Sequence, residues 1–231
     1  KETWFSAMMR IRFLGHSCVE IVGLHHILID PDFTREPLPQ VEYICISHAH
    51  RDHIGKITKV PEGTILASPQ VCDILLEKGI PSSRMRPVIA GEQIENIEIY
   101  PGYSVVNDPV YFLMSLIFRA RRPDPGGVPL SFYIRDDADL LHIGDAHRFP
   151  VELHPDIFCL PWRKSPINSS RYTAMILAMV NQLSAPYLLP IHHDLPGTET
   201  DPAEIARYVD SSLLLGDNWH EFRERNLVSE K

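Results

Sequence analysis

Short apolar segments separated by glycine or polar residues fill the first hundred positions, a pattern typical of β-strands. Gly23 lies between two such segments and favours a hairpin connection there. Ser68 followed by Pro69 is typical of a helix start, and we expect that helix to end near Lys78. The expected strands are Ile11–Leu14, Cys18–Val22, His26–Ile29, Tyr43–Ile46, Thr64–Ala67, Met85–Ile89 and Ile94–Tyr100.

The second half of the chain repeats this order of strands before helices. The expected strands are Leu130–Arg135, Leu140–Ile143, Ile157–Leu160 and Tyr187–Ile191. Apolar spacing and an Asp-Pro start signal predict two helices, over Ser170–Leu183 and Asp201–Leu214. Tyr111–Phe118 is compatible with a strand or a short helix, and Arg119–Gly127 is a turn-rich loop with basic residues. We therefore expect one α+β domain over residues 1–231.

Composition narrows the class of protein. The 231 residues are 44% hydrophobic and 23% charged, as in ordinary globular proteins. The formal net charge of −8 disfavours broad binding to nucleic acid or to an anionic membrane. Residues 1–10 lack a signal-peptide pattern, and no apolar run is long enough to span a membrane. With four scattered cysteines, this predicts a cytoplasmic protein without a membrane partner.

Several of the twelve histidines gather directly after the expected strand Tyr43–Ile46. The segment reads H-x-H-x-D-H, with His48, His50, Asp52 and His53. In extended backbone His48 and His50 point to the same side, because side chains alternate along a strand. Asp52 and His53 follow where the chain is expected to turn into a helix. Imidazole nitrogens and carboxylate oxygens suit zinc and similar divalent metals, so the spacing predicts a metal site.

This segment resembles the signature of the metallo-β-lactamase superfamily. Residues Leu14–Ser17 and Leu28–Pro31 are similar to the start of the branch that contains ascorbate-6-phosphate lactonase and related metal-dependent hydrolases. Gly144-Asp145 resembles the family's Gly-Asp element, and Pro190–His192 resembles its last metal-ligand segment. The resemblance implies a four-layer αβ/βα sandwich, in which two mixed sheets pack face to face with the helices outside.

The resemblance also implies two metal sites that share one carboxylate. Its ligands would be His48 and His50 for the first metal, Asp52, His53 and His192 for the second, and Asp145 between them. The implied cofactor is zinc, as one or two ions, with manganese or iron as alternatives. Asp52 and Asp145 are the candidate catalytic residues, which would orient the nucleophile and accept its proton.

One position departs from the family pattern. The family's further histidine for the first metal would stand at Ser104, and the chain has no histidine between His53 and His142. We hypothesise that the first site binds metal weakly, so that the protein works with one metal or with a different one. His147 is a candidate replacement ligand.

Other polar residues stay open between a role at the site and an ordinary surface or turn position. Arg163 or Lys164 would bind a phosphate or carboxylate of a substrate. The family pattern favours His192 over its neighbour His193 as the ligand. The open residues are His16, His147, His193, Arg163, Lys164 and the basic cluster Arg119–Arg122.

The implied reaction is hydrolysis of a small ester, lactone or phosphoester by a metal-bound hydroxide. Two other functions stay open. A nucleic-acid phosphodiesterase of the same superfamily is disfavoured by the acidic charge balance. A non-catalytic metal-binding or sensing protein is favoured by the missing histidine. The expected partner is a small-molecule substrate, and the sequence leaves open whether the chain forms a homo-oligomer.

Overall fold

Two mixed β-sheets form the centre of the computed structural model, which describes residues 8–103, 113, 126–164 and 169–230. The first sheet has eight strands in the order β15-β14-β1-β2-β3-β4-β5-β6. Their bounds are β1 Met9–Gly15, β2 Cys18–Val22, β3 His26–Ile29, β4 Tyr43–Cys45, β5 Thr64–Ala67, β6 Met85–Pro87, β14 His220–Arg223 and β15 Asn226–Glu230. Strands β3 to β6 are parallel, and the other pairs are antiparallel.

The second sheet has seven strands in the order β13-β12-β11-β10-β9-β8-β7. Their bounds are β7 Gln93–Ile94, β8 Ile97–Pro101, β9 Leu130–Ile134, β10 Leu140–His142, β11 Ile157–Pro161, β12 Tyr187–Ile191 and β13 Ser212–Leu213. Strands β10 to β13 are parallel. The segments that follow β10, β11 and β12 therefore leave the sheet at the same edge.

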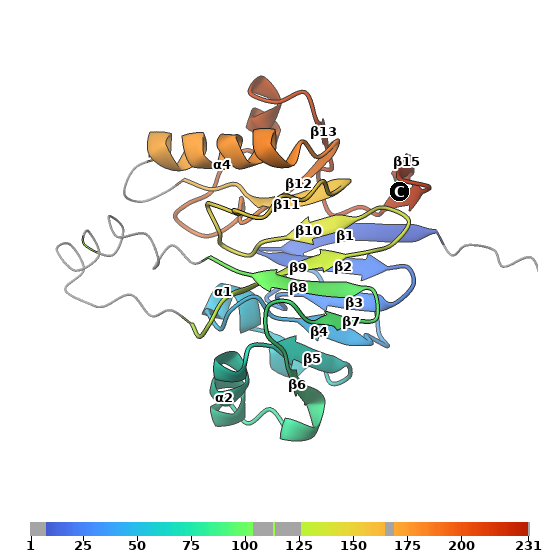
Figure 1. Cartoon of the computed structure of the whole chain (residues 1–231), viewed down its shortest axis with the longest axis vertical. Coiled ribbons are helices and arrows are strands. Elements are labelled where there is room, and N and C mark those ends of the chain that lie inside the picture. The colour runs from blue at the N-terminus through green and yellow to red at the C-terminus, as the bar shows by residue number, and fades with distance from the viewer. Residues whose placement is uncertain (1–7, 104–112, 114–125, 165–168, 231) are drawn as a thin grey trace, which may run out of the picture.

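Helices cover the outer faces of the two sheets. In Figure 1, α2 lies beside β5 and β6 at one end of the molecule, and α4 lies beside β11 and β12 at the other. The α-helices are α1 Arg51–Ile54, α2 Pro69–Glu77 and α4 Ser169–Leu183. Short 3₁₀ helices occur at Ile57–Lys59, Ser82–Arg84 and Pro202–Arg207. Within the described part of the chain, no helix is long and apolar enough to cross a membrane.

The alternation of side chains along each strand separates three buried cores. In β3, Ile27 and Ile29 face the core between the two sheets, whereas Leu28 faces the core beneath α2. In β11, Ile157 contributes to the core between the sheets, whereas Phe158 contributes to the core beneath α4. Every face that carries these apolar residues is covered, which confirms the predicted four-layer sandwich.

The predicted helix over Asp201–Leu214 is wrong. Asp201 does accept a hydrogen bond from the backbone N–H of Ala203, but the helix it starts is a 3₁₀ helix over Pro202–Arg207. Residues Ser212–Leu213 then form β13, which pairs in parallel with β12. The open edge of β12 supplies backbone hydrogen bonds that outweigh the local preference for a longer helix.

Two further differences concern strands. The predicted strand Ile94–Tyr100 is divided into β7 and β8, because the chain reverses at Glu95 with a φ of 50°. The hairpin of β14 and β15, over His220–Glu230, was not predicted. The predicted segment Tyr111–Phe118, apart from the single residue 113, lies outside the described residues, as do Ser104 and the basic cluster Arg119–Arg122.

Candidate metal centre

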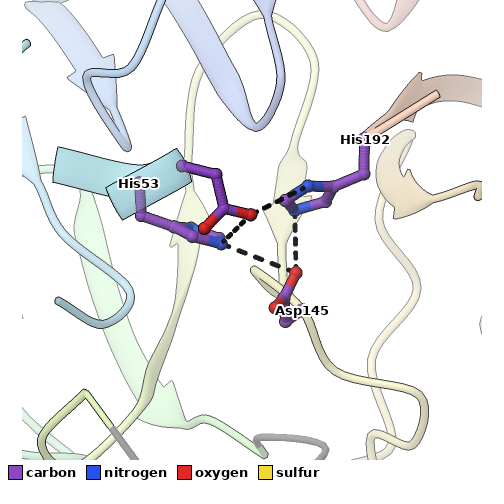
Figure 2. A group of neighbouring side chains, drawn as sticks. His53, Asp145 and His192 are labelled. Carbon is purple, nitrogen blue, oxygen red and sulfur yellow. Dashed lines mark ion pairs between the residues drawn. The ribbon is translucent and has the colours of Figure 1, made fainter. Parts of the chain in front are cut away.

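Loops from both sheets bring six of the predicted site residues together. These residues form two groups, and Asp145 belongs to both. Within each group, the ligand atoms all lie within 4.8 Å of one another. One group, called the four-residue group below, consists of Asp52, His53, Asp145 and His192. The other, called the three-residue group, consists of His48, His50 and Asp145. Figure 2 shows His53, Asp145 and His192 with their polar atoms turned toward a common centre.

The four-residue group is compact and largely buried. Oδ1 of Asp145 lies 2.9 Å from Nε2 of His192 and 3.5 Å from Nε2 of His53. Oδ2 of Asp52 lies 3.7 Å from Nε2 of His53 and 3.8 Å from Nδ1 of His192. His53, Asp145 and His192 are buried, and Asp52 is half-buried. Two carboxylates and two imidazoles thus surround one small volume.

Several buried atoms of this group contact one another as ion pairs but make no well-aligned hydrogen bond with any described residue. They are Nε2 of His53, Oδ1 of Asp145 and both ring nitrogens of His192. Buried polar atoms are normally paired, since an unpaired one costs about 1–3 kcal/mol. Imidazole nitrogen and carboxylate oxygen are the donor types that divalent zinc, manganese and iron accept. A divalent cation therefore fits this group.

Asp30 orients His53 from behind. Oδ2 of Asp30 lies 2.7 Å from Nδ1 of His53, and the backbone N–H of Ser47 donates to Oδ1 at 2.7 Å. Because an ionised carboxylate can only accept, Nδ1 of His53 carries a proton, and Nε2 faces Asp145. Burial would lower the pKa of His53, but Asp30 and Asp145 hold it well above its usual value, so a metal at Nε2 would replace a proton there. Burial alone would raise the pKa of Asp30, but the charge and hydrogen bond of His53 lower it to about 2. The sequence contained Asp30 in a recognised segment but gave no reason to assign it this role.

The three-residue group is looser. Nε2 of His48 lies 2.9 Å from Nδ1 of His50 and 3.7 Å from Oδ2 of Asp145. His48 is buried and His50 is half-buried. Burial, together with the charge of nearby His53, holds the pKa of His48 well below its usual value. His48 is therefore neutral, as a metal ligand must be.

Gly126 packs directly against the two histidines of that group. Its carbonyl accepts a hydrogen bond from the backbone N–H of Ala49 at 2.8 Å, and its φ is +62°. A Cβ at this position would lie 2.9 Å from Cδ2 of His50. Glycine is therefore required by both backbone conformation and close approach. The sequence showed Gly126 only as part of a turn-rich loop.

Backbone geometry selects His192 rather than His193 for the site. His192 has a φ of 61°, and its N–H donates to the carbonyl of His16 at 2.5 Å. The N–H of His16 in turn donates to Asp194 at 2.9 Å. His193 points elsewhere and packs on Phe13, with 4.8 Å between ring centroids. His16 thus contacts the turn that carries His192 through its backbone.

Arg163 lies at the edge of both groups. Its Nη2 is 3.4 Å from Oδ2 of Asp145, and its side chain is 17% exposed. Burial would raise the pKa of Asp145, but Arg163 and His192 hold it well below its usual value. Lys164, by contrast, is exposed. His147 is buried but belongs to neither group among the described residues.

Comparisons with known proteins identify the family of the chain. The family described as "Beta-lactamase superfamily domain" matches residues 10–192. A UPF0173 metal-dependent hydrolase of Methanoculleus marisnigri is 28% identical over 222 residues, covering 90% of this chain and 91% of the relative. A similarly named protein of Nanoarchaeum equitans is 25% identical over 210 residues, covering 87% of this chain and 92% of the relative.

The fold has solved counterparts. Igni18, a metallo hydrolase from the archaeon Ignicoccus hospitalis, has a TM-score of 0.69 at 18% identity, covering 94% of this chain and 99% of that one. At this identity the likeness concerns the fold alone. The family match, however, covers most of the chain and includes every residue of both groups. The chain therefore belongs to the metallo-β-lactamase superfamily.

Proposed function

We propose that this chain is a metal-dependent hydrolase and that Asp52, His53, Asp145 and His192 hold its principal metal ion. The observation that carries the proposal is the convergence of two imidazoles and two carboxylates on one point, with all but Asp52 buried. The names of the curated relatives support the same class of activity. Zinc, as one or two ions, fits these donors, and manganese or iron are the alternatives.

When bound, a divalent cation supplies Lewis acidity and lowers the pKa of water toward neutrality. The chain's own residues supply the rest. Asp30 accepts the Nδ1 proton of His53, so that Nε2 is the ring nitrogen that would bind the metal. Asp145 belongs to both groups, so its carboxylate would be a ligand at each of them. Asp52 is the more exposed carboxylate of the two, so we assign it to orient the attacking water and accept its proton.

We further propose that the two groups bind metal with unequal affinity. The three-residue group has one ligand fewer than the four-residue group, and His50 is only half-buried. No histidine or cysteine occurs in residues 104–125, so that segment can add no imidazole or thiolate. We therefore expect the four-residue group to fill first.

The substrate class we propose is a small ester, lactone or phosphoester, by the similarity to the lactonase-like branch. A nucleic-acid phosphodiesterase is disfavoured by the net charge of −8. A non-catalytic metal-binding protein is the second candidate, because the three-residue group is incomplete by the family's pattern. Cytoplasmic location stays a prediction of the sequence.

The test compares two adjacent histidines. Protein purified without chelator is analysed for metal and assayed with lactones, p-nitrophenyl esters and bis-p-nitrophenyl phosphate, with zinc or manganese added. We expect His192→Ala to lose both bound metal and hydrolysis, whereas His193→Ala keeps both. Asp52→Asn should lose hydrolysis and bind the metal more weakly than wild type, because Asp52 is both a proposed ligand and the proposed proton acceptor. Full hydrolysis by His192→Ala would exclude the proposed site, and tight metal binding without any hydrolysis would favour the non-catalytic alternative.

A further inference from the structure

Three neighbouring parallel strands deliver charged or metal-binding side chains to one edge of the second sheet. Asp145 follows β10, Arg163 follows β11 and His192 follows β12. Since β11 lies between the other two strands, Arg163 emerges between two residues of the four-residue group. Its contact with Asp145 is therefore a consequence of strand order.

The carboxylate of Asp145 presents its two oxygens to different partners. Oδ1 contacts His53 and His192, whereas Oδ2 lies 3.4 Å from Nη2 of Arg163 and 3.7 Å from Nε2 of His48. The guanidinium thus contacts the one carboxylate that belongs to both candidate metal groups. A substrate held at either group would lie within reach of this positive charge.

The backbone around Arg163 is held in place before any ligand arrives. The N–H of Trp162 donates to Ile191 at 2.8 Å, and the N–H of Lys164 donates to Thr198 at 3.0 Å. A guanidinium carried by a fixed backbone loses little conformational entropy on binding an anion.

A buried tyrosine borders the same side chain. The hydroxyl of Tyr172, on α4, donates to the carbonyl of Pro161 at 3.1 Å. Burial raises the pKa of Tyr172 to about 12, against the opposing influence of Arg163. Arg163 is therefore placed between α4 and Asp145, with 17% of its side chain still exposed.

From this placement we infer that Arg163 determines specificity by binding an oxyanion of the substrate, a phosphate or a carboxylate, beside the metal centre. The inference rests on the proposed function and narrows its substrate class to anionic compounds. Guanidinium groups suit this task because their parallel N–H donors match the oxygens of phosphate and carboxylate. The net charge of −8 disfavours a general attraction of anions, so a local cation at this point would add selectivity.

The test measures anion binding rather than turnover. Inorganic phosphate and acetate are titrated by calorimetry into zinc-loaded wild type, Arg163→Met, Arg163→Lys and the control Arg207→Met, with zinc content measured for each. Arg207 is a matched control because it also pairs with a carboxylate, at 4.0 Å from Glu204, but is 73% exposed. We expect Arg163→Met to weaken phosphate binding about tenfold or more at unchanged zinc content, Arg163→Lys to weaken it less, and Arg207→Met to have no effect.

Two outcomes would overturn the inference. Wild-type phosphate affinity in Arg163→Met would show that the guanidinium does not bind the anion. Loss of zinc in that variant would show that Arg163 instead positions Asp145. The relative effect on phosphate and acetate distinguishes the two oxyanions.

A second experiment, which measures hydrolysis, tests this inference separately from the proposed function. If the enzyme is active, Arg163→Met should raise KM for anionic bis-p-nitrophenyl phosphate about tenfold and leave KM for neutral p-nitrophenyl acetate unchanged. Equal changes for both substrates would overturn the role in specificity. If wild type hydrolyses neither compound, the proposed function fails while the phosphate titration still decides the role of Arg163.

Discussion

Buried acidic residues lie at the amino ends of β10 and β11 and at the carboxyl end of β10, and their partners differ between the two ends. At the amino ends, Asp139 precedes β10 and Asp156 precedes β11. Oδ2 of Asp139 lies 3.0 Å from Arg225, 3.2 Å from Arg135 and 3.3 Å from the hydroxyl of Tyr133. Asp156 also contacts Arg225, at 3.2 Å, and accepts the N–H of Asp139. These carboxylates are satisfied within the protein.

At the carboxyl end of β10 the corresponding acid, Asp145, lies among histidines. Nε2 of His53 and both ring nitrogens of His192 make no well-aligned hydrogen bond with any described residue there. Buried nitrogens without a well-aligned hydrogen bond cost free energy in the absence of a ligand. A ligand that binds these atoms would offset that free energy, so the cluster is better explained as a binding site than as a structural feature. The comparison shows why one end works as a structural clamp and the other is a candidate binding site, although the residue types are similar.

The largest expected effect comes from removing Asp145 at the carboxyl end of β10. Adding zinc should stabilise the wild type by about 4 kcal/mol at a free concentration about 1,000 times Kd, because the native state alone binds it. Asp145→Asn removes a ligand from both groups, so we expect this zinc-dependent stabilisation to disappear. Thermal unfolding with and without zinc measures it, and an unchanged zinc response would contradict the assignment of Asp145.

The next effect concerns the support behind the ligands. Asp30→Asn can no longer hold His53 in one tautomer as an ionised acceptor, and we expect zinc affinity to fall about 10–100-fold. Competition with a chromophoric chelator measures the affinity. Asp139→Asn, at the opposite end of β10, is the control and should leave zinc affinity unchanged. Equal affinities in wild type and Asp30→Asn would remove Asp30 from the site.

Asp30 should also make the stability of the metal-free protein depend on pH. Its pKa is lowered to about 2 in the folded chain from an ordinary 3.8, so its stabilisation is present above the ordinary value and is lost as the pH falls. The stabilisation amounts to roughly 2 kcal/mol, and roughly half of it should be lost between about pH 5 and about pH 3. Urea unfolding of wild type and Asp30→Asn gives the difference; a difference that is constant over this range would refute the prediction.

The smallest expected effect comes from removing Arg225, which pairs with Asp139 and Asp156 at the amino ends of β10 and β11. Arg225 is 59% exposed, so its pairs with Asp139 and Asp156 are screened by solvent. We expect Arg225→Met to lower the free energy of unfolding by about 1 kcal/mol, and to leave zinc binding unchanged. Chemical unfolding and a zinc titration of the same variant provide both readouts. A loss of zinc affinity here would mean that the two ends are coupled.

The strands were predictable where the information is local. Segments such as Ile27–Ile29 and Ile157–Leu160 are apolar and bounded by turn residues, so their extended conformation follows from short-range preferences. The hairpin of β14 and β15 carries no such signal, because its turn uses Glu224 and Arg225 at φ 49° and 67° rather than glycine or asparagine. Contacts of Arg225 with Asp139 and Asp156 compensate for that unfavourable turn.

The sequence by itself predicted the donor chemistry, because His48, His50, Asp52 and His53 stand at a spacing typical of metal ligands. The family resemblance implied Asp145 and His192 as their partners, but only the tertiary structure shows these distant residues beside them. Asp145 and His192 arrive from other strands, and a left-handed turn at His192 rather than at His193 sets which imidazole enters the site. Such choices depend on strand order, backbone twist and packing between the sheets, which involve contacts between residues far apart in the chain.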